Sequence, residues 1–217
     1  MLQKKNFSWL LFALLVYLMV VPVAEDIEVL SGRFMRAVTF SWLLAIGVWS
    51  LRGFGNFFKA GIGLAAAGII LSTLAANQPS SIYFYASFAA VWGFVLITIW
   101  CTTTQIAIDH EISANRVVGA ISLYLLLGLL WAVTYAIVEM LSPGSFAGFS
   151  EPRSQGWSSE WLYFSFVTMT TLGYGDLTPV SASARTLAYM QAVFGQFYIA
   201  ILVAGLVAAY ISDRQRS

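Results

Sequence analysis

Long apolar runs separated by short polar stretches dominate the hydrophobic pattern of this chain. A helix that crosses a membrane needs about 20 mostly apolar residues. Six runs come close to or exceed that length, at roughly residues 7–23, 34–51, 57–76, 82–108, 117–141 and 184–212. A further apolar stretch, residues 160–170, is too short to cross. The pattern therefore predicts an all-α membrane protein with six transmembrane helices and a short re-entrant helix between the fifth and the sixth.

The charges in the connections predict how these helices are oriented. With the N-terminus inside, seven of the 11 Lys and Arg residues lie on the cytoplasmic side, which follows the positive-inside rule. Both termini are then cytoplasmic, and we expect a multi-pass protein of the plasma (inner) membrane. The first run has a second interpretation, because Lys4, Lys5, its apolar core and residues 21–24 resemble a secretory signal with a cleavage site. Its length, Trp9 and Tyr17 favour a retained helix.

Residues 170–179 form a polar, Gly- and Pro-containing segment between two apolar runs. Irregular backbone at membrane depth has to be enclosed by protein or line a water-filled path. Ser158, Ser159 and Glu160 offer capping hydroxyls and an acid at a helix start. We therefore predict a short helix over residues 161–170 that points into the membrane, with its negative dipole end facing a site where cations gather.

Composition narrows the class of protein. Of the 217 residues, 59% are hydrophobic and 10% charged, and the mean hydropathy is +0.80, as expected if most side chains face lipid or other helices. A net charge of +1 with scattered basic residues argues against nucleic-acid binding. The single cysteine, Cys101, excludes an intrachain disulfide. No catalytic, metal-binding or phosphate-loop motif is present, so we expect neither an enzyme nor a cofactor.

Residues 168–179 closely resemble the pore signature of potassium channels, with Thr-Leu-Gly-Tyr-Gly-Asp at positions 171–176 as its core. The resemblance covers roughly residues 116–212. It implies that four copies surround one ion path, so the partners are the other chains of a homotetramer, membrane lipid and K⁺ as the conducted ion. It also implies the ion-binding residues: backbone carbonyls of a selectivity filter replace the hydration shell of K⁺. These residues are Thr171, Leu172, Gly173, Tyr174 and Gly175, with the Thr171 hydroxyl as the lowest ligand.

Two positions depart from the usual pattern of that family. Leucine occupies position 172 in place of the commoner valine, and we expect its side chain to point into the packing behind the filter. Tyr163 and Phe164 replace a tryptophan pair, so we expect Tyr163 to donate a hydrogen bond to Asp176.

A single acidic residue lies near the outer end of the fifth run, where an isolated charge in lipid is costly. The resemblance implies that this residue, Glu139, supports the filter by hydrogen bonding to backbone behind it.

The resemblance also points to the inner helix of the pore. Gly195 lies 20 residues after Gly175, where many family members carry a hinge glycine. Close helix packing is an equally good explanation of this glycine. Residues at i, i+3 and i+4 spacing share a helix face. One such face carries Gln196 and the candidate cavity or gate residues Ile199, Val203, Val207 and Ile211.

The first four helices occupy the position of a voltage sensor, but the fourth run contains no Lys or Arg to move in the field. We therefore expect a four-helix domain over residues 1–108 without classical voltage sensing, a cytoplasmic linker at 109–116 and a pore domain at 117–217. His110 lies between two acids in the linker. It is either a pH switch or part of a solvated turn, and the turn is the simpler interpretation.

The predicted function is passive, K⁺-selective conduction. The alternatives are a weakly selective cation channel, because of Leu172, and, from another class, a transporter or accessory subunit. A transporter commonly shows repeated halves with broken helices, whereas this chain has one re-entrant segment. If the chain is complete, gating by a large cytosolic ligand domain requires a separate regulatory subunit.

Overall fold

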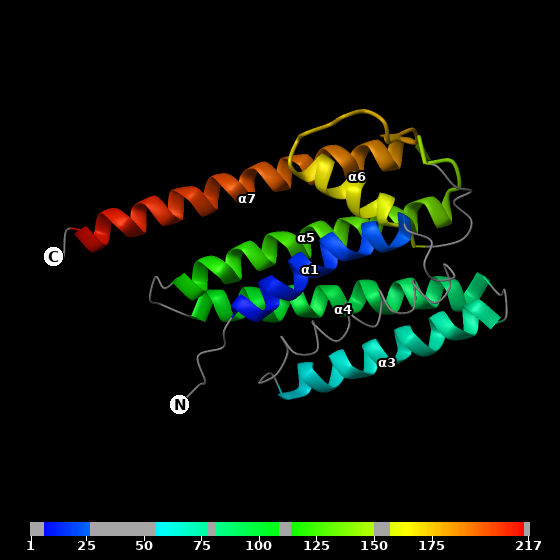
Figure 1. Ribbon diagram of the computed structural model, residues 1–217, viewed down its shortest axis with the longest axis horizontal. Helices are drawn as coiled ribbons and strands as arrows, with labels where there is room; N and C mark the ends of the chain where they lie inside the picture. The colour runs from blue at the N-terminus through cyan, green and yellow to red at the C-terminus, as the bar shows by residue number, and fades with distance from the viewer. Residues whose placement is uncertain (1–6, 27–54, 78–80, 109–113, 150–156, 215–217) are drawn as a thin grey trace.

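The computed structural model describes residues 7–26, 55–77, 81–108, 114–149 and 157–214. The fold of these residues is almost entirely helical (Figure 1). Its helices are α1 (Phe7–Asp26), α3 (Gly55–Asn77), α4 (Ser81–Ile108), α5 (Ala114–Leu141), α6 (Ser159–Met169) and α7 (Ala182–Arg214). Two short strands, β1 (Phe146–Ala147) and β2 (Thr178–Pro179), pair antiparallel.

Five of the six predicted spans coincide with these helices. The second predicted span, residues 34–51, lies outside the described residues. In the described part of the chain, three helices are long and apolar enough to cross a membrane, namely Phe57–Ala75, Ile82–Ala107 and Asn115–Leu141. Phe7–Val23 forms a shorter apolar helix. The predicted linker is partly wrong, because α5 already begins at Ala114 and residues 114–116 are helical.

The helices before α5, namely α1, α3 and α4, pack on α5 either directly or through one another. Figure 1 shows α1 lying along α5, with α4 and then α3 below α5 in this view; α1 and α4 contact α5, and α3 contacts α4. Leu14 and Tyr17 of α1 are buried in the common core. At the start of α1, the backbone N–H of Phe7 donates to Oδ1 of Asn115 at 2.9 Å. A retained first helix requires packing of this kind against the rest of the chain.

The short helix α6 lies between α5 and α7, and it begins where its capping residues predict. Ser158 is the N-cap: its backbone is extended, and its hydroxyl accepts from the backbone N–H of Glu160 at 3.2 Å. Such a cap satisfies one of the N–H groups that a helix start leaves unpaired. Trp161, Leu162 and Phe164 bury the apolar side of α6. This helix has the position and nearly the length of the predicted re-entrant helix.

An aromatic cluster fills the space between α5, α6 and the chain that follows α5. The Tyr135 ring packs edge-on against Phe146 and Phe164, with ring centroids 5.5 Å and 4.9 Å apart. Phe146 also packs edge-on against Trp161, at 5.2 Å. Edge-to-face pairs of this kind contribute about 0.5–1.5 kcal/mol each beyond the area they bury. The cluster holds α6 and the β1 segment in fixed positions.

Candidate pore and selectivity filter

The segment that follows α6 has an alternating backbone conformation. Thr171, Gly173 and Gly175 have positive φ angles of 58°, 58° and 84°, while Leu172 and Tyr174 between them do not. Left-handed angles at alternate residues allow successive N–H groups to gather on one side of the backbone. A positive φ is easy for glycine and costly for threonine, which makes Thr171 the strained member of the segment.

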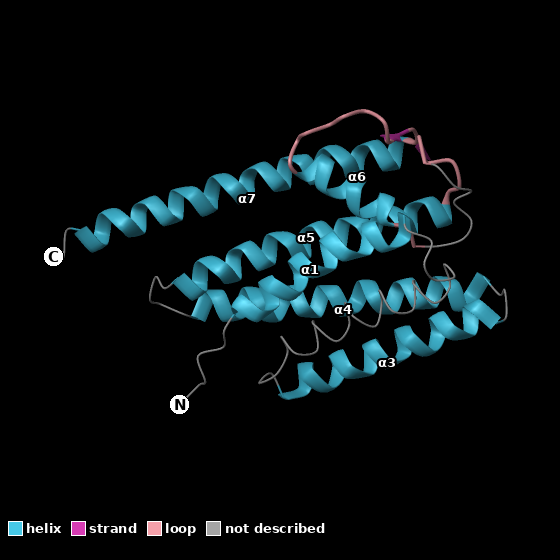
Figure 2. Cartoon of the chain, in the orientation of Figure 1, coloured by secondary structure: helices cyan, strands magenta, loops and turns pink. Residues whose placement is uncertain are grey.

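The amide groups of this segment are held by α6. The N–H groups of Leu172 and Gly173 both donate to the carbonyl of Val167, at 2.9 Å and 3.4 Å, and the N–H of Thr171 donates to Thr168 at 3.0 Å. Because the amides face the end of α6, the carbonyls of the same residues face away from it. Figure 2 shows the loop leaving α6 and arching beside α7 toward the short strands.

The side chains of the segment are exposed in the single chain. Leu172 is 55% exposed and Tyr174 is 68% exposed. The prediction that Leu172 packs behind the filter stays a prediction, because more than half of this side chain is left open in the single chain. Such packing requires a second copy of the chain.

The predicted hydrogen bond between Tyr163 and Asp176 is present. Oη of Tyr163 donates to Oδ2 of Asp176 at 2.6 Å, and the Tyr163 ring stacks parallel to that of Tyr174, with centroids 6.5 Å apart. The bond lowers the pKa of the Asp176 carboxyl below its ordinary value and raises the pKa of the Tyr163 phenol to about 12. Both shifts favour the hydrogen-bonded, ionised carboxylate.

Glu139 also hydrogen-bonds to backbone, at a turn that follows α5. Its carboxylate oxygens accept from the N–H groups of Gly144 and Phe146, at 2.8 Å and 3.1 Å, and the side chain is buried. Phe146 pairs in turn with Pro179, just after the filter segment. Glu139 therefore fixes the turn whose strand is paired with the chain leaving the filter.

The outer end of the segment approaches a glycine that the sequence analysis missed. Gly148 has a φ of 95°, and a Cβ built on it would overlap the carbonyl oxygen of Asp176. A glycine next to β1 is thus needed for the close approach of two backbones. The only signal for this contact is the Phe-Ala-Gly-Phe pattern of residues 146–149, which is too common to identify a contact.

On the inner helix, Gly195 packs against the end of α6. A Cβ at Gly195 would overlap the carbonyl oxygen of Met169 and lie 3.0 Å from its Cγ, so close packing explains this glycine directly, while a hinge role stays a prediction. Gln196 lies one residue further on, with Nε2 3.5 Å from the Thr171 hydroxyl oxygen.

The gate candidates can be placed only in part. Ile199 is exposed on α7. Val203, Val207 and Ile211 lie within the same helix, but their side chains are outside the described residues. Their role as a gate stays a prediction.

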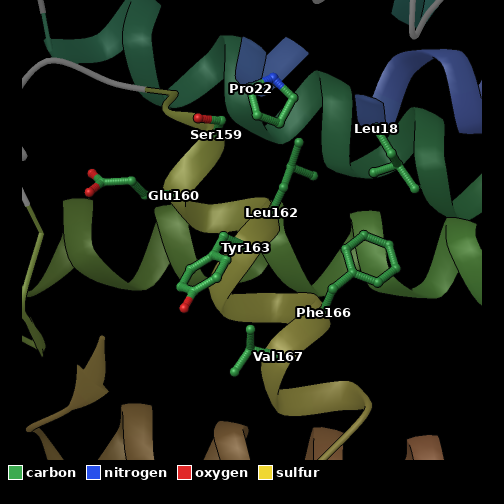
Figure 3. Close-up of a pocket in the computed structure, with 8 residues that line it drawn as sticks. All are labelled: Leu18, Pro22, Ser159, Glu160, Leu162, Tyr163, Phe166 and Val167. Carbon is green, nitrogen blue, oxygen red and sulfur yellow. The ribbon is translucent and has the colours of Figure 1, made fainter. Parts of the chain in front are cut away.

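A mostly apolar hollow of about 390 Å³ lies between α1 and α6 (Figure 3). Its lining residues are Leu18, Pro22, Ser159, Glu160, Leu162, Tyr163, Phe166 and Val167. Residues of both helices thus face the same space, which places α1 beside the helix that carries the filter.

Comparison with known proteins agrees with this geometry. Residues 121–212 match a family model described as an ion channel. Two-pore potassium channel 3 of Arabidopsis thaliana is 45% identical over 56 residues, which are 26% of this chain and 13% of the relative. Two-pore potassium channel 1 of the same plant is 32% identical over 109 residues, or 50% of this chain and 27% of the relative.

A further similar protein is also named as a potassium channel. The inward rectifier potassium channel Kirbac3.1 of Paramagnetospirillum magnetotacticum is 30% identical over 92 residues, which are 41% of this chain and 27% of the relative. This chain therefore spans about a quarter or less of the length of these relatives. The matched region is similar to the ion channel family, and the relatives named here are potassium channels. The predicted resemblance to potassium channels is confirmed, and the chain is grouped with channels and not with enzymes.

Proposed function

We propose that this chain is one subunit of a homotetrameric channel that conducts K⁺ selectively and passively. The observation that carries the proposal is the backbone of residues 171–175, in which positive φ angles recur at every second residue while α6 holds the amides. Four such strands around an axis would present rings of carbonyl oxygens to a dehydrated cation. The Thr171 hydroxyl would form the innermost ring. The potassium channels among the relatives support K⁺ as the ion.

The exposure of the single chain supports assembly. The filter side chains Leu172 and Tyr174 and the α7 side chains Phe194, Phe197 and Ile201 are all more than half exposed. Apolar surface of this extent needs a partner or lipid to cover it. Four chains around the ion path would cover the side nearest the axis, and lipid would cover the rest.

The proposed topology has six spans, with the second in residues 34–51, both termini in the cytoplasm and the chain in the plasma (inner) membrane. The positive-inside bias supports this orientation. Classical voltage gating is not part of the proposal, because α4 carries no Lys or Arg between Ser81 and Ile108. No cofactor is proposed, since the backbone supplies the ligands for K⁺.

The test is K⁺ flux through purified protein in liposomes, with Ba²⁺ as a blocker and native mass measurement of the oligomer. Gly173→Ala is the filter variant and Gly144→Ala its matched control. Both glycines have positive φ, 58° and 87°, and neither has another group within 4 Å of an added Cβ. The two variants therefore carry a similar local strain, and loss of flux in Gly173→Ala alone supports the filter assignment.

Three results would contradict parts of the proposal. Intact tetramers of the natural sequence that carry no K⁺ flux exclude a spontaneously conducting K⁺ channel. Equal Na⁺ and K⁺ permeability from reversal potentials would favour the weakly selective alternative. Equal flux in both glycine variants would remove residues 171–175 from the ion path.

A further inference from the structure

A buried group of three polar side chains joins the helices around the candidate filter. Gln191 of α7, Tyr135 of α5 and Ser165 of α6 are each fully buried. Oη of Tyr135 donates to Oε1 of Gln191. Nε2 of Gln191 donates to the backbone carbonyl of Ser165 at 3.0 Å and lies 2.8 Å from its hydroxyl oxygen. Both polar atoms of the glutamine amide, Oε1 and Nε2, therefore have hydrogen-bond partners on two other helices.

A second hydrogen bond joins these side chains to α5. The hydroxyl of Ser165 donates to the backbone carbonyl of Gly128 at 2.7 Å. A Cβ at Gly128 would overlap the ring of Phe166, so α5 and α6 are in close contact there. We refer to Tyr135, Ser165 and Gln191 as the polar trio. Because buried polar groups at membrane depth have no water to bond, breaking one link leaves its partner unsatisfied.

The location of the polar trio relates it to the filter. Ser165 lies two residues before Val167. The Val167 carbonyl accepts hydrogen bonds from the N–H groups of Leu172 and Gly173. On α7, Gln191 lies one helical turn before Gly195, which packs against Met169 at the end of α6. The trio thus fixes the rotation of α6 about its axis at the turn on which the filter strand depends.

We propose that Gln191 is a positioning residue: it sets the register between the inner helix and α6, and it transmits displacements of α7 to the filter amides. This inference rests on the proposed channel function but concerns a different part of the molecule. Gln191 is fully buried between α5 and α6. It acts through Ser165 and then through the Val167 carbonyl, so its removal should alter the filter before it alters the rest of the pore domain.

A purely structural role for the polar trio makes a different prediction. If Gln191 only adds stability, its replacement should lower the unfolding temperature and raise hydrogen exchange across α5, α6 and α7 to a similar degree. If it positions the filter, exchange should rise mainly at the amides of Leu172 and Gly173. The two roles therefore differ in where protection is lost.

The experiment is hydrogen–deuterium exchange on the purified full-length protein in K⁺, with readout on a peptide covering residues 166–176. Gln191→Leu removes all links to α7, and Tyr135→Phe removes one. Tyr124→Phe is the matched control, because Tyr124 is another α5 tyrosine whose hydroxyl has no partner among the described residues. Ser122→Ala is the second control, since its hydroxyl bonds only within α5, to Val118.

We expect Gln191→Leu to speed exchange of the filter amides by about tenfold, which corresponds to the loss of a little over one buried hydrogen bond. Tyr135→Phe should give a smaller increase, and both controls should match the natural sequence. In the Tyr135→Phe/Gln191→Leu double variant the increases should not add, because one network is removed twice.

The inference is overturned if Gln191→Leu and Tyr124→Phe show the same exchange at residues 166–176, or if protection is lost evenly over α5–α7. If Gln191→Leu does not assemble, Tyr135→Phe decides alone, and exchange equal to its control overturns the inference. The measurement needs no conduction. Failure of K⁺ flux in the natural sequence therefore rejects the proposed function separately.

Discussion

Replacing Gly195 by alanine adds one methyl group where α7 crosses the end of α6. The new Cβ would overlap the carbonyl oxygen of Met169 and lie 3.0 Å from its Cγ and 3.2 Å from its carbonyl carbon. Met169 is the last residue of α6, two positions before Thr171. The substitution therefore perturbs the base of the candidate filter as well as the helix pair.

The cost can be worked from this geometry. Relief of the overlap requires the two backbones to separate by about 1 Å, since packed interiors have few voids to absorb a methyl group. Overpacking of this kind costs about 1–3 kcal/mol, and alanine returns about 1 kcal/mol of helix propensity relative to glycine. We expect a net loss of up to about 2 kcal/mol, or a fall of up to about 8 °C in the midpoint of thermal unfolding for a chain of this size.

The assay is thermal unfolding of the detergent-purified protein, followed by K⁺ flux in liposomes. Gly205→Ala is the control on the same helix, because nothing lies within 4 Å of a Cβ built there, and it should be neutral or slightly stabilising. The packing role predicts a less stable Gly195→Ala variant. A variant that is as stable as the natural sequence, and yet opens less, would refute this reasoning and favour the hinge.

Three further substitutions test the surroundings of the filter. Tyr163→Phe removes the donor that lowers the pKa of Asp176. Without that donor Asp176 is protonated at a higher pH, so K⁺ flux that depends on the ionised carboxylate should be lost at a higher outer pH than in the natural sequence, as measured in a pH titration. Glu139→Gln places an amide donor opposite backbone N–H groups such as that of Phe146, and should cost about 2 kcal/mol in chemical unfolding, with equal stability arguing against the role. Ser158→Ala removes the cap of α6 and should cost about 1 kcal/mol, while replacement by aspartate should restore stability.

Local features of the pore could be predicted from the sequence because they depend on neighbours along the chain. The length of α6, its Ser158 cap and the bond between Tyr163 and Asp176 involve residues no more than 13 positions apart. Their geometry follows from one short helix and one turn. The sequence also indicated that Glu139 bonds to backbone, but its partners in the turn at Gly144 and Phe146 depend on a strand pair that no pattern indicated.

The polar trio could not be predicted in the same way. Tyr135 and Gln191 are 56 positions apart, and their meeting depends on how α5 and α7 are rotated about their axes. In a soluble helix an apolar stripe reveals that rotation. Helices that face lipid and protein are apolar on most sides, so the face that meets a neighbour is hidden in the pattern. The available signal is Gln191 itself, an uncharged polar residue within an apolar run, which inside a membrane calls for a partner.

The contacts of the described helices indicate how the first part of the chain can influence the pore. The helix α1 contacts α5 and α6 directly and shares a hollow with α6, whereas α3 contacts α4 and α4 contacts α5. Among the described helices, a displacement of α4 can therefore reach the filter through α5, where Tyr135 connects it to the polar trio. A displacement of α1 acts on α6 directly, because the two helices are in contact. Because α4 carries no basic charge for a membrane field to move, we expect α1 to be the described peripheral helix whose displacement affects α6 most directly.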